Sequence, residues 1–197
     1  MSMLVVIDGL DASGKSTQAE MLAEHLRKSG KTCVLRTHPS EDNFFGVKGR
    51  EYLFIEGKKA HIAASLFYLA DVIRSITLYA WRRVDYVIFV RYLMGTAYLP
   101  APAHKLAYNF FTRIVPTKGS LIYLNVSPAE AFRRVVNNRV KTERFETIDE
   151  LSKTADKALD LVSDGKWTIV DGDRPISEIH EDVLRAAGIK QLPWASP

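Results

Sequence analysis

Cysteine is almost absent from this sequence of 197 residues, in which Cys33 is the only one. A single thiol cannot form a disulfide within the chain, and it excludes the cysteine sets that hold structural zinc. The five histidines do not recur at the spacings that metal ligands show. The sequence therefore predicts a fold stabilised by a hydrophobic core, in a reducing and cytoplasmic setting.

Long hydrophobic runs and strong charge are also missing. No uninterrupted apolar run is long enough to cross a bilayer, and the first residues lack a basic segment followed by a cleavage site. We expect neither export nor a membrane partner. The net charge of +4 is mildly basic, and no basic stripe is interleaved with aromatic residues, so we expect an anionic small ligand and no nucleic acid.

What the chain does have is a regular alternation of β-rich runs and amphipathic stretches. Its length and its 47% of hydrophobic residues suit a single domain over residues 1–197. The alternation predicts a parallel sheet with helices on both faces, and the nearly continuous apolar strands suggest burial on both sides. We expect strands at 3–7, 32–36, 86–91, 121–126 and 167–170, and helices at 15–28, 61–82, 149–162 and 176–187.

Two helix boundaries carry local signals. Gly30 is a plausible C-terminal cap for the first helix. Ser127 and Glu130 have the spacing of a capping box, with Pro128 at the first helical position. A further helix is therefore expected to begin immediately after the fourth strand.

The most informative motif lies between the first strand and the first helix. It is a Walker A loop, or P-loop, that reads Gly9-Leu10-Asp11-Ala12-Ser13-Gly14-Lys15-Ser16, with Thr17 after it. The glycines let backbone N–H groups turn toward a phosphate, the lysine adds positive charge and the serine hydroxyl reaches a metal ion. The following helix points its positive end at the same anion. We therefore expect this segment, Gly9 to Thr17, to bind ATP.

Arginines indicate where a reaction would take place. Arg91 ends the third strand, at the sheet edge where ligands bind in open α/β folds. The segment of about 133–146 is rich in cations, namely Arg133, Arg134, Arg139, Lys141 and Arg144. It is either a solvated helix end or a lid that closes over transferring phosphates, and the P-loop favours the lid.

The segment Asp8 to Gln18 resembles the P-loop of the thymidylate kinase family, including its Thr-Gln ending. Other segments follow in that family's order, so that the resemblance covers nearly the whole chain. They are Gly46 with Arg50, Leu66-Phe67-Tyr68-Leu69-Ala70-Asp71, Val90-Arg91-Tyr92, Ala97-Tyr98, Leu124-Asn125-Val126-Ser127-Pro128, Glu143-Arg144-Phe145-Glu146 and Val170-Asp171-Gly172.

The resemblance implies a P-loop NTPase fold with three α/β/α layers and a five-stranded parallel sheet. It also implies transfer of the γ-phosphoryl group of Mg-ATP to a deoxynucleoside monophosphate, most simply dTMP. Lys15 would neutralise the β and γ phosphates, Ser16 would bind Mg²⁺, and Arg91 and Arg50 would orient the acceptor phosphate. A further catalytic arginine would come from the lid, as Arg139 or Arg144. A homodimer is implied in the same way.

Two departures from the family pattern leave questions open. Val90 replaces an aspartate that assists Mg²⁺ and phosphate binding, so Asp8 or Asp11 would have to take its place near the metal. Phe67 would stack on the base and Tyr98 would line the acceptor site. Asp71 stands where an arginine reads thymine, and Arg74 shares its helix face. Either Arg74 restores that contact, or Asp71 selects a base with an exocyclic amine.

Three functions are therefore compared. The first is a thymidylate-kinase-like enzyme, for dTMP or for a nucleotide with another base. The second is a nucleotide-binding switch or partner-binding module with weak or no transfer, which Val90 suggests. A deoxynucleoside kinase is disfavoured, because a hydroxyl acceptor needs a strong base and Val90 removes the carboxylate that would act as one. The P-loop lysine, Ser16 and the cationic segment favour the enzyme.

Overall fold

The computed structural model describes residues 2–55, 58–79, 82–138 and 147–190. At its centre is a parallel sheet of five strands in the order β2-β3-β1-β4-β5. The strands are β1 (Met3–Gly9), β2 (Cys33–Thr37), β3 (Tyr86–Val90), β4 (Ser120–Asn125) and β5 (Trp167–Asp171). This confirms the predicted fold class, and each predicted strand differs from the observed one by at most two residues at either end.

Eight helical segments surround the sheet in the described part of the chain. They are α1 (Lys15–Lys28), α2 (Phe44–Leu53), α3 (Lys58–Tyr79), a 3₁₀ helix η1 (Met94–Tyr98), α4 (Ala103–Ile114), α5 (Pro128–Asn138), α6 (Ile148–Val162) and α7 (Ile176–Ala186). The four helices expected with both ends are present. The helix expected at 61–82 is α3, which starts three residues earlier than expected and ends at Tyr79. The sequence did not predict α2, α4 or η1.

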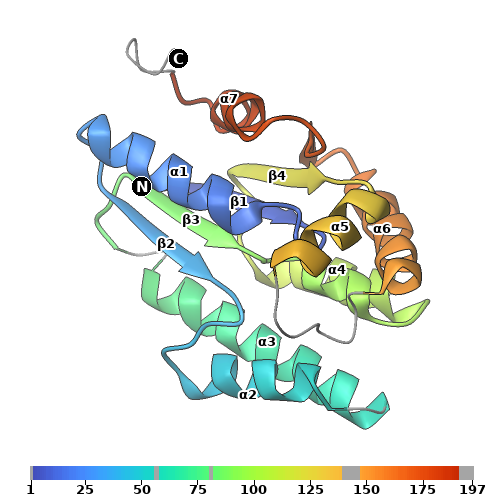
Figure 1. Cartoon of the computed structure of the whole chain (residues 1–197). Helices are drawn as coiled ribbons and strands as arrows, with labels where there is room; N and C mark the ends of the chain where they lie inside the picture. Colours follow the sequence, from blue (N-terminus) through green and yellow to red (C-terminus); the bar gives the residue numbers. More distant parts are fainter. Residues whose placement is uncertain (1, 56–57, 80–81, 139–146, 191–197) are drawn as a thin grey trace.

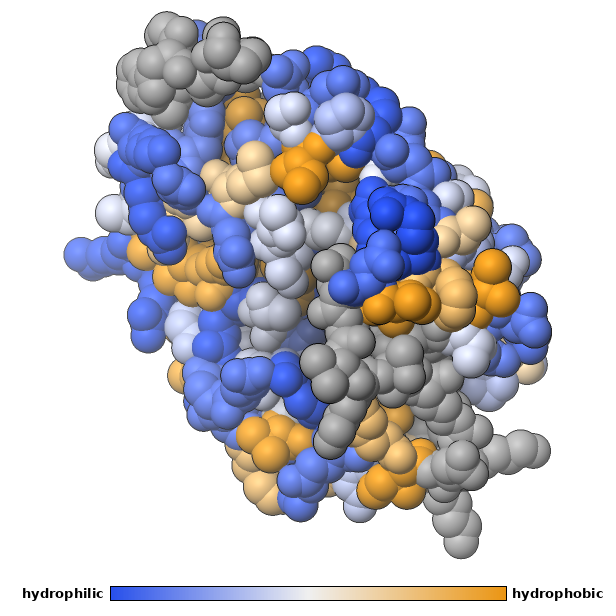
Figure 2. Space-filling model, viewed as in Figure 1, coloured by the Kyte–Doolittle hydropathy of each residue, from blue (hydrophilic) through white to orange (hydrophobic). Residues whose placement is uncertain are grey.

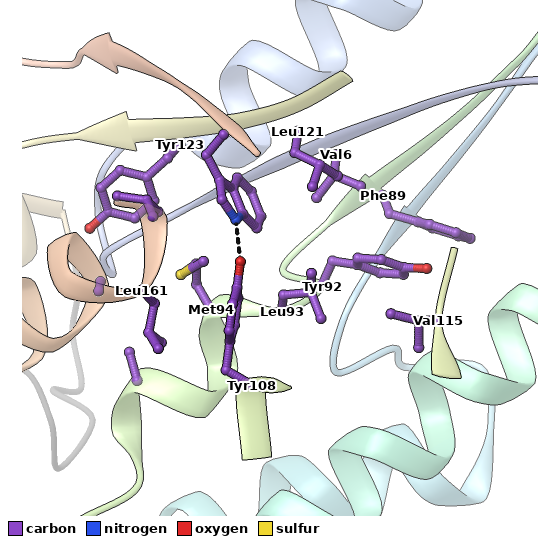
Figure 3. Close-up of a cluster of buried hydrophobic side chains, with 14 of the residues drawn as sticks. Val6, Phe89, Tyr92, Leu93, Met94, Tyr108, Val115, Leu121, Tyr123 and Leu161 are labelled. Carbon is purple, nitrogen blue, oxygen red and sulfur yellow. Dashed lines mark hydrogen bonds between the residues drawn. The ribbon is translucent and has the colours of Figure 1, made fainter. Parts of the chain in front are cut away.

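The helices form a layer on each face of the sheet (Figure 1). On one face, Leu22 and Leu26 of α1 and Val183 of α7 pack against β1, β3 and β4. On the other face, α3, α4 and α6 pack around Phe89 and Tyr123 (Figure 3). Tyr108 of α4 accepts a hydrogen bond from Trp167 Nε1 at 2.8 Å within this second cluster. The sheet thus lies between two hydrophobic cores, a first core with α1 and α7 and a second core with α3, α4 and α6.

Burial on both faces holds for the central strands only. In β1, β3 and β4 the inner residues are buried, whereas β2 is half-buried and Thr168, Ile169 and Asp171 of β5 are exposed. The expectation of full burial is therefore wrong for β2 and β5, because an edge strand has a neighbour on one side alone.

Of the two helix-end signals predicted from the sequence, one is present in full and the other only in part. Gly30 follows the last turn of α1 with φ of 73°, as expected beyond a helix C-terminus. Ser127 Oγ accepts from the Glu130 N–H at 3.3 Å, but the Glu130 carboxylate binds Arg133 and Arg134. The Ser127 N–H donates to Asp173. The capping box is thus half formed, because two arginines compete for its glutamate.

One described helix is long and apolar enough to resemble a membrane span. Residues Ile62–Tyr79 of α3 have a mean hydropathy of 1.4, and 22% of them are buried. The same stretch contains Asp71, which is completely buried and hydrogen-bonded to the segment before α2. Helix α3 is therefore a helix of the folded domain with one exposed apolar face. Apolar residues also reach the surface among hydrophilic ones on the face of the molecule drawn in Figure 2.

Candidate active site

The P-loop makes a tight turn between β1 and α1. Ala12 and Gly14 have positive φ angles of 59° and 90°, and a Cβ on Gly9 would lie 2.6 Å from the Leu124 carbonyl oxygen. The Lys15 side chain is buried, and its ammonium group donates to the Leu10 carbonyl and to Ser13 Oγ at 3.4 Å. Ser16 and Thr17 are exposed in the first turn of α1. That turn contains no acidic residue, so the positive helix end stays open to an anion.

Asp8 anchors the turn that follows β3. Its Oδ2 accepts from the backbone N–H groups of Tyr92, Leu93 and Met94 at 2.8, 3.0 and 2.9 Å. Its Oδ1 accepts from the Gly9 N–H at 3.1 Å, and the residue is 1% exposed. With both oxygens bonded to backbone donors, Asp8 joins the P-loop to the Arg91 turn and does not face solvent as a metal ligand would.

Asp11, Arg91 and Tyr98 meet beside the P-loop. The Arg91 guanidinium forms an ion pair with Asp11 Oδ1, and the Tyr98 hydroxyl donates to Asp11 Oδ2 at 2.7 Å. Burial, followed by the nearby Asp11 carboxylate, raises the pKa of Tyr98 well above its usual range, so the hydroxyl stays a donor. Arg91 itself has a φ of 59°. This φ lies in the left-handed region, where a non-glycine residue is strained, and such strain is common at functional sites.

A pocket opens next to this cluster and reaches the second core. It encloses about 940 Å³, including space open to solvent. At one end it is bounded by the P-loop residues Asp8, Gly9 and Asp11 together with Arg91. Its other walls come from α2, α3, η1 and α4 and from the segment after β2, through Pro39, Gly49, Tyr52, Leu53, Ala64, Ser65, Tyr68, Met94, Gly95, Thr96, Tyr98, Leu99 and Phe111. The geometry suits a molecule whose anionic end lies at the P-loop and whose flat body lies between helices.

The α3 residues expected to contact a base do not line this pocket. Phe67 stacks on Tyr52, with ring centroids 5.5 Å apart. Asp71 is fully buried and bonded to Ser40 and Asn43, and Arg74 is not among the lining residues. The ring on the pocket wall is that of Tyr68, one residue later. The sequence reasoning missed it because α3 is apolar on several sides, which leaves its helical phase ambiguous.

With Tyr68 in place of Phe67 on the pocket wall, the residue one helical turn farther along α3 also differs from the expected one. Four residues beyond Tyr68 lies Val72, which is 2% exposed and packs in the second core. A valine cannot hydrogen-bond to a base, so neither Asp71 nor Val72 supplies the expected contact. The structure therefore removes the proposed role of Asp71 in base selection.

The remaining expected residues are placed as follows. Arg50 is exposed and is not among the lining residues, but it donates to Glu41 at 2.6 Å and to the carbonyl of Pro39, which lines the pocket, at 3.2 Å. Val90 is completely buried in the first core. The segment 133–138 is the last part of α5, and Arg134 donates to the Gly172 carbonyl at 2.9 Å. Arg139, Lys141 and Arg144 lie outside the described residues.

Known proteins are similar to this chain over most of its length. A family model for thymidylate kinase matches residues 7–183. The probable thymidylate kinase of Pyrococcus abyssi is 30% identical over 192 residues, covering 91% of this chain and 93% of that protein. The thymidylate kinase of Plasmodium falciparum is 26% identical, over 92% of this chain and 87% of that protein. The solved structure of Candida albicans thymidylate kinase superposes with a TM-score of 0.69 at 21% identity, over 93% of this chain and 90% of that chain.

The solved structure supports the fold, while the family model and the relatives extend to the segments that build the P-loop, the Arg91 turn and the pocket beside them. On these grounds, the chain belongs to the thymidylate kinase family.

Proposed function

We propose that this protein transfers the γ-phosphoryl group of ATP to the phosphate of dTMP, giving ADP and dTDP. The observation that carries the proposal is the meeting of the P-loop with the pocket at Gly9 to Asp11, with Arg91 between the two. A donor phosphate on the loop and an acceptor phosphate at Arg91 would then face each other. Membership in the thymidylate kinase family supports both the reaction and the acceptor.

Catalysis of this reaction depends on positioning the two phosphates and on offsetting their negative charge, more than on a strong base. An oxygen of the acceptor phosphate is already largely ionised near neutral pH, and it forms the new bond to the γ phosphorus as the bond to ADP breaks. Lys15 would offset the charge of the β and γ phosphates. Arg91 and Arg50 would hold the acceptor phosphate, and Arg139 or Arg144 would add charge from the segment between α5 and α6.

The residues at the loop fit a magnesium ion that arrives with the nucleotide. Among the described residues no group of three or more His, Cys, Asp or Glu side chains could hold a metal by itself. Mg²⁺ commonly keeps several waters and binds through substrate phosphates with few protein ligands. The exposed hydroxyl of Ser16, beside Lys15, is suited to be such a ligand. When bound, the ion would offset charge on the donor phosphates.

We further propose a homodimer in the cytoplasm. The face of α3 that points away from the domain carries exposed Ile62 and Leu66, at 58% and 61%, followed by half-exposed Leu69 and Ile73. These positions lie three or four residues apart and form one apolar stripe, which a second copy of the chain would bury. Cys33 is a free thiol, which fits a reducing compartment.

The reaction is tested by ADP release from Mg-ATP, with dTMP, dUMP, dCMP, dGMP and dAMP supplied one at a time and an acceptor-free control. We expect turnover that depends on dTMP, and a decrease of roughly 100-fold or more in the Lys15→Ala protein because charge stabilisation is lost. Turnover with another acceptor alone would change the assigned base. ATP binding without any acceptor-dependent turnover would contradict the proposal and favour a nucleotide switch.

A further inference from the structure

Asp71 is a carboxylate buried inside the protein with neutral hydrogen-bond donors around it. It is 0% exposed, and it accepts from the Ser40 N–H at 2.6 Å, from Ser40 Oγ at 2.5 Å and from Asn43 Nδ2 at 2.8 Å. A buried carboxylate is strongly destabilising unless such bonds compensate it. The charge is therefore tied to one specific conformation of the segment 40–43, which lies between β2 and α2.

That conformation determines where α2 begins. With its amide nitrogen committed to Asp71, Asn43 directs its Oδ1 to the N–H groups of Phe45 and Gly46, at 3.0 and 3.1 Å. This caps the helix N-terminus. Gly46 also lies against Ser40 so closely that a Cβ would be 2.0 Å from the Ser40 carbonyl oxygen. The first turn of α2, and with it the position of Arg50 farther along the same helix, therefore depends on the contacts of Asp71.

The residues just before Ser40 connect to the other arginine. His38 Nδ1 lies 3.0 Å from the Arg91 carbonyl oxygen, and the His38 N–H donates to the Val90 carbonyl at 3.0 Å. Arg50 donates to the Pro39 carbonyl at 3.2 Å. Figure 1 shows the chain running from the end of β2 to α2, which lies along α3. The segment His38 to Asn43 thus contacts the Arg91 backbone through His38. At its other end it leads into α2, the helix that contains Arg50.

We propose that Asp71 is a positioning residue for the acceptor phosphate: through the segment His38 to Asn43, it holds Arg50 and Arg91 at the separation that the phosphate of dTMP requires. The inference rests on the proposed function for the identity of the acceptor. Asp71 itself does not contact the nucleotide. Its removal acts on acceptor binding, because the bonds of the segment described above go to Asp71, Val90, Arg91 and Arg50.

Asp71→Asn is the variant that tests this role. The side chain keeps its size, but its amide NH₂ must face donors from Ser40 and Asn43. We expect the KM for dTMP and the Kd for dTMP measured by calorimetry to rise roughly 10- to 100-fold, because both arginines are displaced from the acceptor phosphate. The KM for ATP should stay within about twofold of the wild-type value, since the hydrogen bonds of Asp71 described above go to Ser40 and Asn43 and not to the P-loop.

Two further variants separate positioning from loss of stability. Asn43→Asp combined with Asp71→Asn moves the carboxylate to the other end of the same hydrogen bond, and it should restore most of the dTMP affinity. Val183→Ala in α7 makes a cavity in the first core, on the face of the sheet opposite to α3. It should lower the melting temperature and leave the Kd for dTMP unchanged.

The outcomes are distinct. A wild-type Kd for dTMP in Asp71→Asn, or an equal rise in the KM for ATP, would overturn the inference. Failure of the double variant to recover affinity would do the same. If the wild-type protein binds dTMP without turnover, the proposed reaction fails, and the Kd comparison still decides the role of Asp71. If the wild-type protein does not bind dTMP, both proposals fall.

Discussion

Arg91, Asp11 and Tyr98 come from three different segments, and each side chain limits the freedom of the others. Arg91 has a positive φ of 59°, a conformation that destabilises a non-glycine residue by about 1–3 kcal/mol. The ion pair with Asp11 and the bond from His38 to its carbonyl oxygen offset that strain. The guanidinium is consequently oriented before any ligand arrives, which lowers the entropy cost of binding an anion.

Tyr98→Phe tests how much this orientation contributes. The change removes the 2.7 Å hydrogen bond to Asp11 and leaves the ring on the pocket wall. Hydrogen bonds to charged groups contribute about 1.5–3 kcal/mol, so we expect kcat/KM for dTMP to fall roughly 10- to 100-fold. Steady-state kinetics measure the loss.

Tyr108→Phe is the matched control for that variant. Its hydroxyl is also paired with a carboxylate, that of Asp164 at 3.1 Å, but it lies in the second core and does not line the pocket. Tyr108→Phe should reduce the free energy of unfolding and leave kcat/KM unchanged. Equal losses of kcat/KM in both variants would show that the Tyr98 hydroxyl has no special role.

At the scale of elements, α2 is held against its neighbours by two glycines with different surroundings. A Cβ on Gly46 would lie 2.0 Å from the Ser40 carbonyl oxygen and 2.6 Å from the Ser40 nitrogen, whereas the nearest atom at Gly49 is at 3.4 Å. Gly46→Ala should therefore destabilise the protein by about 1–3 kcal/mol, as overpacking does. Gly49→Ala should stabilise it by up to about 1 kcal/mol, because alanine favours a helix.

Urea unfolding of both variants measures the difference. Since the two residues belong to one helix, a general effect of added methyl groups would appear in both. A Gly46→Ala protein as stable as the wild type would mean that α2 can move away from Ser40, and it would weaken the argument that Asp71 fixes this helix.

These two glycines also show where sequence reasoning reaches its limit. The strands, the P-loop and α1 follow from local signals: apolar runs, glycine spacing and a lysine at a helix start. Helix α2 has no such signal, because it contains Gly46 and Gly49 and is held by Asn43 and Asp71, a contact between residues 28 positions apart. In α3 the sequence located the helix but not its phase, so Phe67 was expected where Tyr68 lies.

At the scale of the whole molecule, buried histidines make stability depend on pH. Burial lowers the pKa of His38 below its ordinary value of 6.5, and burial followed by the neighbouring His25 lowers that of His180. Well above pH 6.5 both histidines are neutral in the folded and in the unfolded chain. As the pH falls below 6.5, the unfolded chain binds protons that the folded chain excludes, so stability decreases by at most about 1.4 kcal/mol per pH unit for each histidine.

Urea unfolding between pH 7 and pH 5 measures this slope. Carboxylates with a lowered pKa, such as Glu130 beside Arg133 and Arg134, lose their contribution only below their ordinary value of 4.5. They do not interfere in that window. His38→Asn keeps a donor for the Arg91 carbonyl. It should reduce the pH slope of the unfolding free energy by at most the contribution of one proton, about 1.4 kcal/mol per pH unit. A slope unaffected by this change would exclude His38 as a source of the pH dependence.

The exposed apolar face of α3 is the feature that a single copy of the chain leaves unexplained. A helix with the composition of Ile62–Tyr79 usually buries most of its surface, yet Ile62 and Leu66 are 58% and 61% exposed. Leu66→Glu should convert the proposed dimer to a monomer in sedimentation velocity, because each charge would have to be buried at the interface. Leu106→Glu on α4, which is 68% exposed, is the control and should leave the dimer intact. A wild-type protein that sediments as a monomer at micromolar concentration would refute the proposed dimer and leave this apolar face for a different partner.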